Sequence, residues 1–157
     1  MRWQDIDQQP CSLARTLAIV GDRWTLLVLR DCFLGVRRFE QFQERLGVTR
    51  HVLSDRLRKL QEGGILDKVA YQERPRREEY RLTARGRDLY PVIVHLAQWG
   101  DTYLAGEEGP PLVRIHRQCG EPLAAQLQCG HCGETVAARD IRVEENPYWA
   151  GEILINN

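Results

Sequence analysis

The chain of 157 residues has no long apolar run, and nowhere do about eighteen apolar residues follow one another. A membrane-spanning helix requires a run of that length, so we expect none. The first ten residues, MRWQDIDQQP, are polar and lack the apolar centre of a signal peptide. We therefore expect a cytoplasmic protein, whose five cysteines are thiols or metal ligands before they are disulfides.

The sequence also lacks the motifs of common enzymes. It shows no pairing of a nucleophile with a base, no phosphate-binding loop and no paired catalytic acids, so we predict that the chain is not an enzyme. An apolar fraction of 43% is sufficient for a packed core. The length suits one domain with a small appendage.

The chain also lacks a net charge, but its basic and acidic residues are unevenly distributed along the sequence. Residues 49–91 carry eleven basic and seven acidic side chains, whereas residues 92–157 carry four basic and nine acidic ones. The middle of the chain is therefore positive and its C-terminal part is negative. This distribution favours a polyanionic partner that meets only the middle of the chain.

Residues 49–60, TRHVLSDRLRKL, have the pattern of a short amphipathic helix. Three leucines recur at helical spacing on one edge, and Thr49 precedes them where an N-cap hydroxyl would lie. The opposite edge carries hydrogen-bonding groups, on His51, Ser54, Asp55, Arg58 and Lys59. A helix of this kind fits the major groove of DNA. The alternative is an ordinary amphipathic helix on the protein surface.

The preceding residues predict the other helix of a helix-turn-helix. Further helices are expected at residues 12–20, 22–34 and 40–46. The second of these is apolar over most of its surface and should form the buried centre. Gly47 and Val48 would turn the chain from the third helix into residues 49–60. Residues 1–10 would form a loose arm, and residues 36–39 a short strand or bridge.

The residues after the amphipathic helix predict a two-stranded wing. Strands are expected at residues 65–71 and 79–82, with Ile65, Val69 and Tyr71 facing inward. The segment between them, QERPRRE, would be an exposed tip with three arginines, Arg74, Arg76 and Arg77. These side chains would lie on phosphates or in the minor groove. The alternative is a solvated hairpin turn.

A long helix is expected over residues 84–104, capped by Thr83 and bent at Pro91. It carries more apolar side chains than one contact face can bury. The surplus predicts a homodimer formed through this helix and the N-terminal helix, and a two-fold dimer would bind a pseudo-palindromic site. The alternative is that the first helix of the same chain covers the excess.

Residues 11–100 resemble the HxlR-type family of winged-helix bacterial transcription regulators, relatives of the MarR group. The resemblance rests on CSLARTLAIVGDRWTLLVLRDCFLGVRRFEQFQ, VLSDRLRKLQEGGIL and PRREEYRLTARGRDL, in that order. The matching positions are Cys11, Gly21, Trp24, Leu53, Ser54, Arg56, Leu57, Tyr80, Leu82, Thr83 and Gly86. Ser12 departs from the pattern, because a proline commonly follows the cysteine. The resemblance implies a mainly α-helical winged helix-turn-helix dimer that binds double-stranded operator DNA at the nucleoid, responds to a small-molecule or redox effector and, we expect, represses transcription.

Roles can be assigned to the residues of the expected DNA-binding region. His51, Ser54, Asp55 and Arg58 would reach base edges, and Arg58 would pair with guanine. The residues expected at phosphates are Arg37, Arg38, Arg50, Arg56 and Lys59, and Thr49 at the start of the helix is also assigned to the DNA-binding surface. Arg56 has an alternative role, as the partner of an acidic neighbour inside the domain.

The C-terminal part contains a cysteine cluster in residues 115–134, IHRQCGEPLAAQLQCGHCGE, although no internal repeat is apparent. His116, Cys119, Cys129 and Cys132 are spaced as two zinc knuckles, with a glycine directly after Cys119 and Cys132. We predict a structural Zn²⁺ site in a β zinc-ribbon-like module over residues 112–145, with AAQLQ as a strand. The module would follow a linker at 106–111 and precede a tail at 146–157. The alternatives are His131 as the fourth ligand, an empty site, or a disulfide.

Cys11 precedes the first predicted helix, where a thiol tends toward the reactive thiolate. A redox or electrophile sensor at Cys11, or at the cysteine cluster by loss of metal, is therefore an alternative mode of regulation. The competing interpretation is that Cys11 packs as a small hydrophobic residue. Cys32 lies in the buried helix and is assigned to the core. A further class of function is a protein- or RNA-binding adaptor that uses the cysteine cluster as its contact module.

Overall fold

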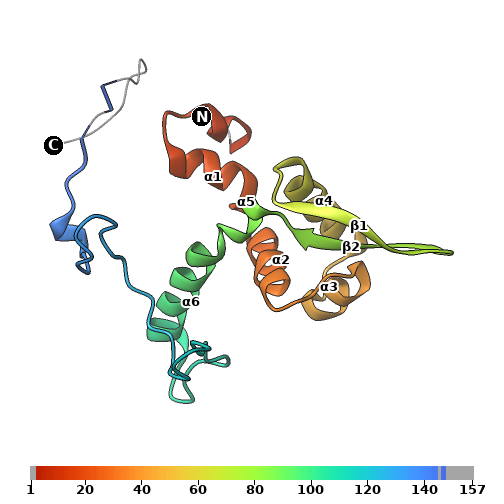
Figure 1. Ribbon diagram of the computed structural model, residues 1–157. Helices are drawn as coiled ribbons and strands as arrows, with labels where there is room; N and C mark the ends of the chain where they lie inside the picture. Colours follow the sequence, from red (N-terminus) through yellow and green to blue (C-terminus); the bar gives the residue numbers. More distant parts are fainter. Residues whose placement is uncertain (1–2, 145, 148–157) are drawn as a thin grey trace. The chain divides into compact units, whose positions relative to one another are not determined.

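The computed structural model describes residues 3–144, 146 and 147, and the chain forms two compact units, residues 1–93 and 94–157. The elements of the first unit are η1 (Trp3–Gln8), α1 (Ser12–Val20), α2 (Arg23–Phe33), α3 (Phe39–Leu46), α4 (Arg50–Glu62), β1 (Leu66–Glu73), β2 (Arg76–Leu82) and α5 (Ala84–Arg87) (Figure 1). Helix α6 (Tyr90–Leu104) runs across the boundary, and η2 (Ala138–Asp140) lies in the second unit. This mainly helical architecture with a two-stranded wing confirms the predicted fold class.

The N-terminal helices begin and end where local chemistry requires. Helix α2 starts after Asp22, whose carboxylate accepts hydrogen bonds from the N–H groups of Trp24 and Thr25, at 2.9 and 3.3 Å. The expected loose arm is a 3₁₀ helix, η1, instead. At residues 36–39, where a short strand or bridge is expected, no strand is formed, and one backbone bond joins this stretch to the wing, from Tyr80 N–H to Arg37 C=O at 2.8 Å.

The core of the first unit is built on the leucine edge of α4. Leu53, Leu57 and Leu60 are 0–1% exposed and pack with Leu29 of α2 and Phe42 of α3. Each buried leucine contributes roughly 1.5–3 kcal/mol relative to an exposed one. The edge therefore fixes the rotation of α4 about its axis, and the opposite edge must face outward.

The wing is longer than the sequence predicts, because β1 and β2 pair from Leu66↔Leu82 to Glu73↔Arg76. Only Arg74 and Pro75 remain at the tip. Tyr71 sits in a β-bulge, where the register shifts between Ala70 and Gln72. The prediction that Val69 and Tyr71 face inward is wrong, since the hairpin projects past the helices (Figure 1) and the two side chains stay 36% and 37% exposed, outside the core.

The predicted long helix is divided into α5 and α6, with the break before Tyr90. Pro91 lies in the first turn of α6, where its missing N–H costs no hydrogen bond. Ahead of the break, the hydroxyl of Thr83 donates to the carbonyl of Gly64 at 2.7 Å and accepts from Gly86 N–H at 2.9 Å. These bonds join the start of α5 to the segment that leads into β1.

The second unit has little regular structure beyond α6. Among the described residues from 105 to 147 none is buried, and the pairing there is limited to the bridges Ile115↔Pro122 and Gln128↔Thr135. The expected strand AAQLQ is not formed. The predicted tail, with Tyr148 and Trp149, falls outside the described residues from residue 148 onward. Of the helices described, none has both the length and the hydropathy that a membrane span demands.

Candidate nucleic-acid interface

The outward edge of α4 carries the polar groups that the sequence predicts. Thr49 is the N-cap, and its hydroxyl accepts from Val52 N–H at 3.4 Å. His51 and Ser54 are exposed near the start of the helix, and Arg58 and Lys59 are exposed one turn further on. Because the leucine edge is buried, these side chains project from the same outer surface.

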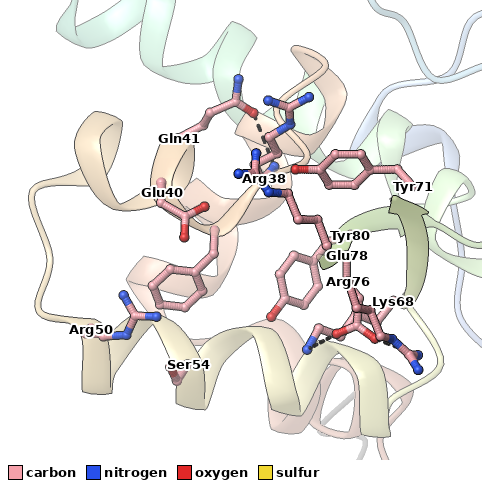
Figure 2. Close-up of a pocket in the computed structure, with 12 residues that line it drawn as sticks. Arg38, Glu40, Gln41, Arg50, Ser54, Lys68, Tyr71, Arg76, Glu78 and Tyr80 are labelled. Atoms are coloured by element: carbon pink, nitrogen blue, oxygen red, sulfur yellow. Dashed lines mark hydrogen bonds and ion pairs between the residues drawn. The ribbon is translucent and has the colours of Figure 1, made fainter. Parts of the chain in front are cut away.

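A groove of about 880 Å³ lies beside this surface, between the start of α3, the first turns of α4 and the wing (Figure 2). The side chains that line it are predominantly basic and aromatic. They belong to Arg38, Phe39, Glu40, Gln41, Arg50, Ser54, Lys68, Tyr71, Arg76, Arg77, Glu78 and Tyr80. Helix, turn and wing therefore contribute to a single concave surface of the kind that suits an anionic backbone.

Two arginines of the groove are positioned by aromatic rings. The guanidinium of Arg38 lies over the ring of Tyr71, and that of Arg50 over the ring of Phe39, each 4.7 Å from the ring centroid. The bulge at Tyr71 brings its ring to the start of α3, as Figure 2 shows. Neither arginine forms an ion pair with any residue in the described part of the chain, so both guanidinium groups remain available to an external anion.

The other wing cations differ in how they are neutralised. Lys68 and Arg76 both pair with Glu78, at 2.8 and 3.0 Å. The hydrogen bond from Lys68, with the neighbouring charges, lowers the pKa of Glu78, which therefore stays ionised. By contrast, Arg74 and Arg77 form no ion pair within the described ranges. The predicted wing arginines thus divide into one neutralised and two unneutralised charges.

Arg58 is held by two carboxylates of its own helix. It lies 2.6 Å from Asp55 and 2.7 Å from Glu62, while Lys59 lies 3.4 Å from Asp55. Burial works to raise the pKa of Asp55, but the hydrogen bonds and charges of Arg58, Lys59 and Arg56 outweigh it and lower that pKa. In the DNA-free chain Arg58 is therefore oriented along the helix surface.

Arg56 takes the alternative role considered from the sequence. Its Nε lies 2.9 Å from Asp22 Oδ1, and its Nη1 lies 3.0 Å from Asp55 Oδ2. The Asp22 carboxylate also caps α2, so Arg56 joins α4 to the start of α2. The prediction that Arg56 meets phosphate is not favoured by this placement.

Arg37 is separated from its neighbour Arg38. Its guanidinium lies 3.8 Å from Glu79, and the side chain lines a different, smaller cavity that it shares with Cys32. The structure therefore brings Arg38 into the groove and leaves Arg37 outside it. Sequence reasoning missed Lys68, Phe39 and Tyr71 as groove residues, although an aromatic next to a basic wing was a usable signal.

The cysteines occupy contrasting environments. Cys11 is exposed immediately before α1. Burial, followed by the charge of Asp31, raises the pKa of Cys32 to about 12. In the C-terminal segment His116 Nδ1 lies 3.2 Å from Cys119 Sγ. The backbone N–H groups of Cys132 and His131, with the Cys132 thiol, bond the Cys129 sulfur and lower its pKa.

The predicted zinc ligands are not gathered in one place. Within the described ranges, no three His, Cys, Asp or Glu side chains lie close enough together to hold a metal ion. The structure brings the ligands together only as two separate pairs, His116 with Cys119 and Cys129 with Cys132.

Comparisons with known proteins agree with this geometry. The family model described as "HxlR-like helix-turn-helix" matches residues 19–108. An uncharacterized HTH-type transcriptional regulator of Mycobacterium tuberculosis strain H37Rv is 52% identical over 136 residues, 87% of this chain and 86% of that protein. Because the chain has 157 residues, a match of that length includes residues 22–136 and so extends through both ligand pairs.

Solved structures show the same fold. The crystal structure of PA1607, described as a candidate transcription factor, superposes with a TM-score of 0.80 at 38% identity, over 89% of this chain and 98% of that one. The redox regulator HypR in its reduced form superposes with a TM-score of 0.55 at 29% identity, over 59% and 92% of the two chains. The chain belongs to the HxlR-like helix-turn-helix family, and it is a DNA-binding transcription regulator.

Proposed function

We propose that this regulator represses transcription as a homodimer, placing α4 of each subunit in the major groove of one half of a pseudo-palindromic operator. The observation that carries the proposal is the position of the basic groove between α4 and the wing. If α4 enters the major groove with its polar edge, opposite the buried leucines, the groove cations would be brought to the flanking phosphates. As a DNA-bound repressor, the protein would act at the nucleoid.

The ion pairs of the basic side chains support different roles for them at this interface, some at phosphates and others at bases. Arg38, Arg50, Arg74 and Arg77, unpaired among the described residues, would supply most of the phosphate contacts. His51 and Ser54 would meet base edges without first breaking an ion pair. Arg58 would have to exchange Asp55 and Glu62 for a guanine, so its contact with a base would be gained only on a matching sequence.

The dimer is proposed from an apolar stripe on α6. Val92, Leu96, Trp99 and Tyr103 recur at helical spacing, and each is more than half exposed. The rings of Trp99 and Tyr103 are in contact, with centroids 5.3 Å apart and planes tilted by 49°, which makes a continuous aromatic surface at one end of the stripe. Leu13 of α1 is also 67% exposed. Such a stripe on a winged-helix protein is best covered by a second copy, which also supplies the second half-site reader.

The stripe can be tested with the same substitution at two leucines of α6. Leu96→Glu places a charge on the stripe and should convert the dimer to monomer in light scattering after gel filtration. Leu104→Glu is the matched control, since Leu104 is at least as exposed but lies off the stripe by helical periodicity. A dimer that survives Leu96→Glu, or a wild-type protein that is monomeric, would overturn the proposed assembly.

The operator can be tested by selecting bound sequences from random duplex DNA. The expected product has two inverted half-sites one helical turn apart, roughly 34–36 Å between centres. Enrichment of a single half-site, or of no sequence at all, would contradict the proposal. The latter result would favour the adaptor function instead. A reporter fused to the selected site then distinguishes repression from activation.

A thiol signal at Cys11 is a second candidate for how the regulator is controlled. Two observations favour it: Cys11 is exposed directly before α1, and the chain resembles a redox regulator, HypR. Oxidation with diamide should then release the operator from the wild-type protein but leave the Cys11→Ser variant bound. Equal release from both proteins would exclude Cys11 as the sensor.

A further inference from the structure

Residues 114–123 and 127–136 form two hairpins with the same backbone hydrogen bonds, thirteen residues apart. In the first hairpin His116 N–H donates to Glu121 C=O and Leu123 N–H to Arg114 C=O, at 2.9 and 2.7 Å. In the second hairpin Cys129 N–H donates to Glu134 C=O and Val136 N–H to Leu127 C=O, at 2.8 and 3.0 Å. The structure thus contains an internal repeat, which the sequence analysis did not find.

The repeat extends to the turns that carry the cysteines. Gly120 N–H donates to His116 C=O at 2.8 Å, and Gly133 N–H donates to Cys129 C=O at 2.9 Å. The two glycines have φ values of 76° and 78°, in the left-handed region that favours glycine. Each turn therefore presents its first and fourth residues, His116 and Cys119 or Cys129 and Cys132, in the same way.

The pair His116 and Cys119 has the geometry of half a metal site. A tetrahedral zinc with bonds of about 2.0 Å to nitrogen and about 2.3 Å to sulfur holds these two ligands roughly 3.5 Å apart. His116 Nδ1 and Cys119 Sγ are 3.2 Å apart. The second turn has the same backbone, with Gly133 N–H bonded to Cys129 C=O at 2.9 Å, so it can present Cys129 and Cys132 in the same way.

The described residues of the C-terminal segment form no buried core of their own. None of its described residues is buried, and apolar side chains such as Leu112, Val113, Leu123 and Leu127 are all exposed. A short segment without a core needs a disulfide or a metal to hold a fixed structure. The cysteines are all free, which leaves the metal.

The two hairpins differ in how they are attached to α6. Gln98 bonds both backbone groups of Ala125, at 2.7 and 3.0 Å, and Arg114 pairs with Asp101 at 3.2 Å. Residues 126–144, all described, make no hydrogen bond or ion pair with α6. The second hairpin is therefore tethered only through its connection to the first and can close against it.

We propose that the two hairpins are halves of one structural zinc site, in which His116 Nδ1 and the sulfurs of Cys119, Cys129 and Cys132 of a single chain bind one Zn²⁺. The three thiols lose their protons to solvent when the metal binds, and no electron is transferred. With four protein ligands the site has no open position, so its role is to fold the segment.

The metal content of the full-length protein, purified in reductant without chelator, tests the proposal. Wild type should carry about one zinc per chain, and His116→Asn and Cys129→Ser should each lower this severalfold. The matched controls are His131→Asn, in the second turn, and Cys11→Ser, at the exposed cysteine outside the segment. Both controls should retain the metal. Less than about half an equivalent in wild type, or loss in His131→Asn with retention in His116→Asn, would overturn the ligand set.

Two further measurements keep the proposal falsifiable if a variant folds poorly. Replacement of zinc by Co²⁺ in wild type should give the visible absorption of a tetrahedral site with thiolate ligands. Mixing the Cys119→Ser protein with the Cys129→Ser protein tests whether the site is completed within one chain. Within-chain closure predicts no recovery of zinc in the mixture, whereas recovery would show that two chains share each site.

Discussion

The guanidinium of Arg38 rests on the ring of Tyr71, and the contact joins the start of α3 to the bulge in β1. Both elements line the basic groove, together with the first turns of α4. The contact therefore fixes the position of one unneutralised charge relative to the helix that reads DNA. Arg38 and Tyr71 should affect DNA binding in different ways, because Arg38 carries the charge and Tyr71 only positions it.

Arg38→Ala and Tyr71→Leu should separate these two contributions. Removal of Arg38 deletes one phosphate contact in each subunit of the proposed dimer, so the slope of log affinity against log salt should flatten by about 1.8. Tyr71→Leu removes a cation–π contact worth about 0.5–1 kcal/mol in each subunit and should weaken binding by the dimer about five- to thirtyfold with the slope unchanged. Fluorescence anisotropy of a labelled operator at several salt concentrations measures both. An equal change of slope in the two variants would contradict the assigned roles.

Neighbouring wing arginines should also differ. Arg77 has no ion pair among the described residues, whereas Arg76 is paired with Glu78. Arg77→Ala should therefore flatten the salt slope by nearly one phosphate contact per subunit, about 1.8 for the proposed dimer, and Arg76→Ala should flatten it less. The double variant should show the sum. If the double variant kept the wild-type slope, the wing would not contact phosphate.

Arg58 should influence which sequence is bound more than how tightly DNA is bound overall. Asp55 and Glu62 form ion pairs with Arg58, and a non-specific duplex offers no guanine contact to replace them. Arg58 should therefore stay paired with these carboxylates on non-specific DNA. Arg58→Ala should relax the preference at one base pair of each half-site by about 1–3 kcal/mol. Lys59→Ala, which removes a neighbouring cation at the same carboxylate, should weaken all sequences alike. Competition with singly substituted operators distinguishes the two outcomes.

The sequence predicts those parts of the fold that depend on a local periodic pattern of apolar residues. Helix α1 ends at Val20 before Gly21 as expected, and Leu53, Leu57 and Leu60 form the buried edge of α4. Helical spacing expresses burial directly, because each turn returns to the same face. The outward surface of α4 follows from its buried edge without further information.

The features that the sequence does not predict depend on partners far along the chain. Arg56 meets Asp22, and the buried Asp31 meets Arg45 at 3.3 Å, through tertiary contacts that no local pattern encodes. The bulge at Tyr71 is set by its pairing with β2 rather than by alternation within β1. The hairpin repeat was accessible, since Cys-Gly-Glu occurs at residues 119–121 and again at 132–134.

Gly86 marks a close approach that tolerates no side chain. A Cβ added there would collide with the carbonyl oxygen of Ile65, which also accepts from Thr83 N–H at 3.1 Å. Gly86→Ala should lower the free energy of unfolding by about 1–3 kcal/mol, because backbone has to shift. Gly100→Ala is the matched control, since open space surrounds that position within α6. The control should be neutral or stabilising by up to about 1 kcal/mol in denaturant unfolding.

Cys32 should be far less reactive than an exposed cysteine of the same chain. Burial and the charge of Asp31 raise its thiol pKa to about 12, so the nucleophilic thiolate is rare near neutral pH. Iodoacetamide at about pH 8 should modify Cys11 and leave Cys32 intact, as judged by mass spectrometry of peptides.

The rate of modification of Cys32 should then rise roughly tenfold per pH unit while the protein stays folded. Because the unfolded thiol titrates near 9.0, any stability gained by keeping Cys32 protonated is present below that pH and is lost as the pH rises toward 12. Rapid modification of Cys32 at pH 8 in folded protein would show that α2 opens to solvent, and the core assignment of this cysteine would then be wrong.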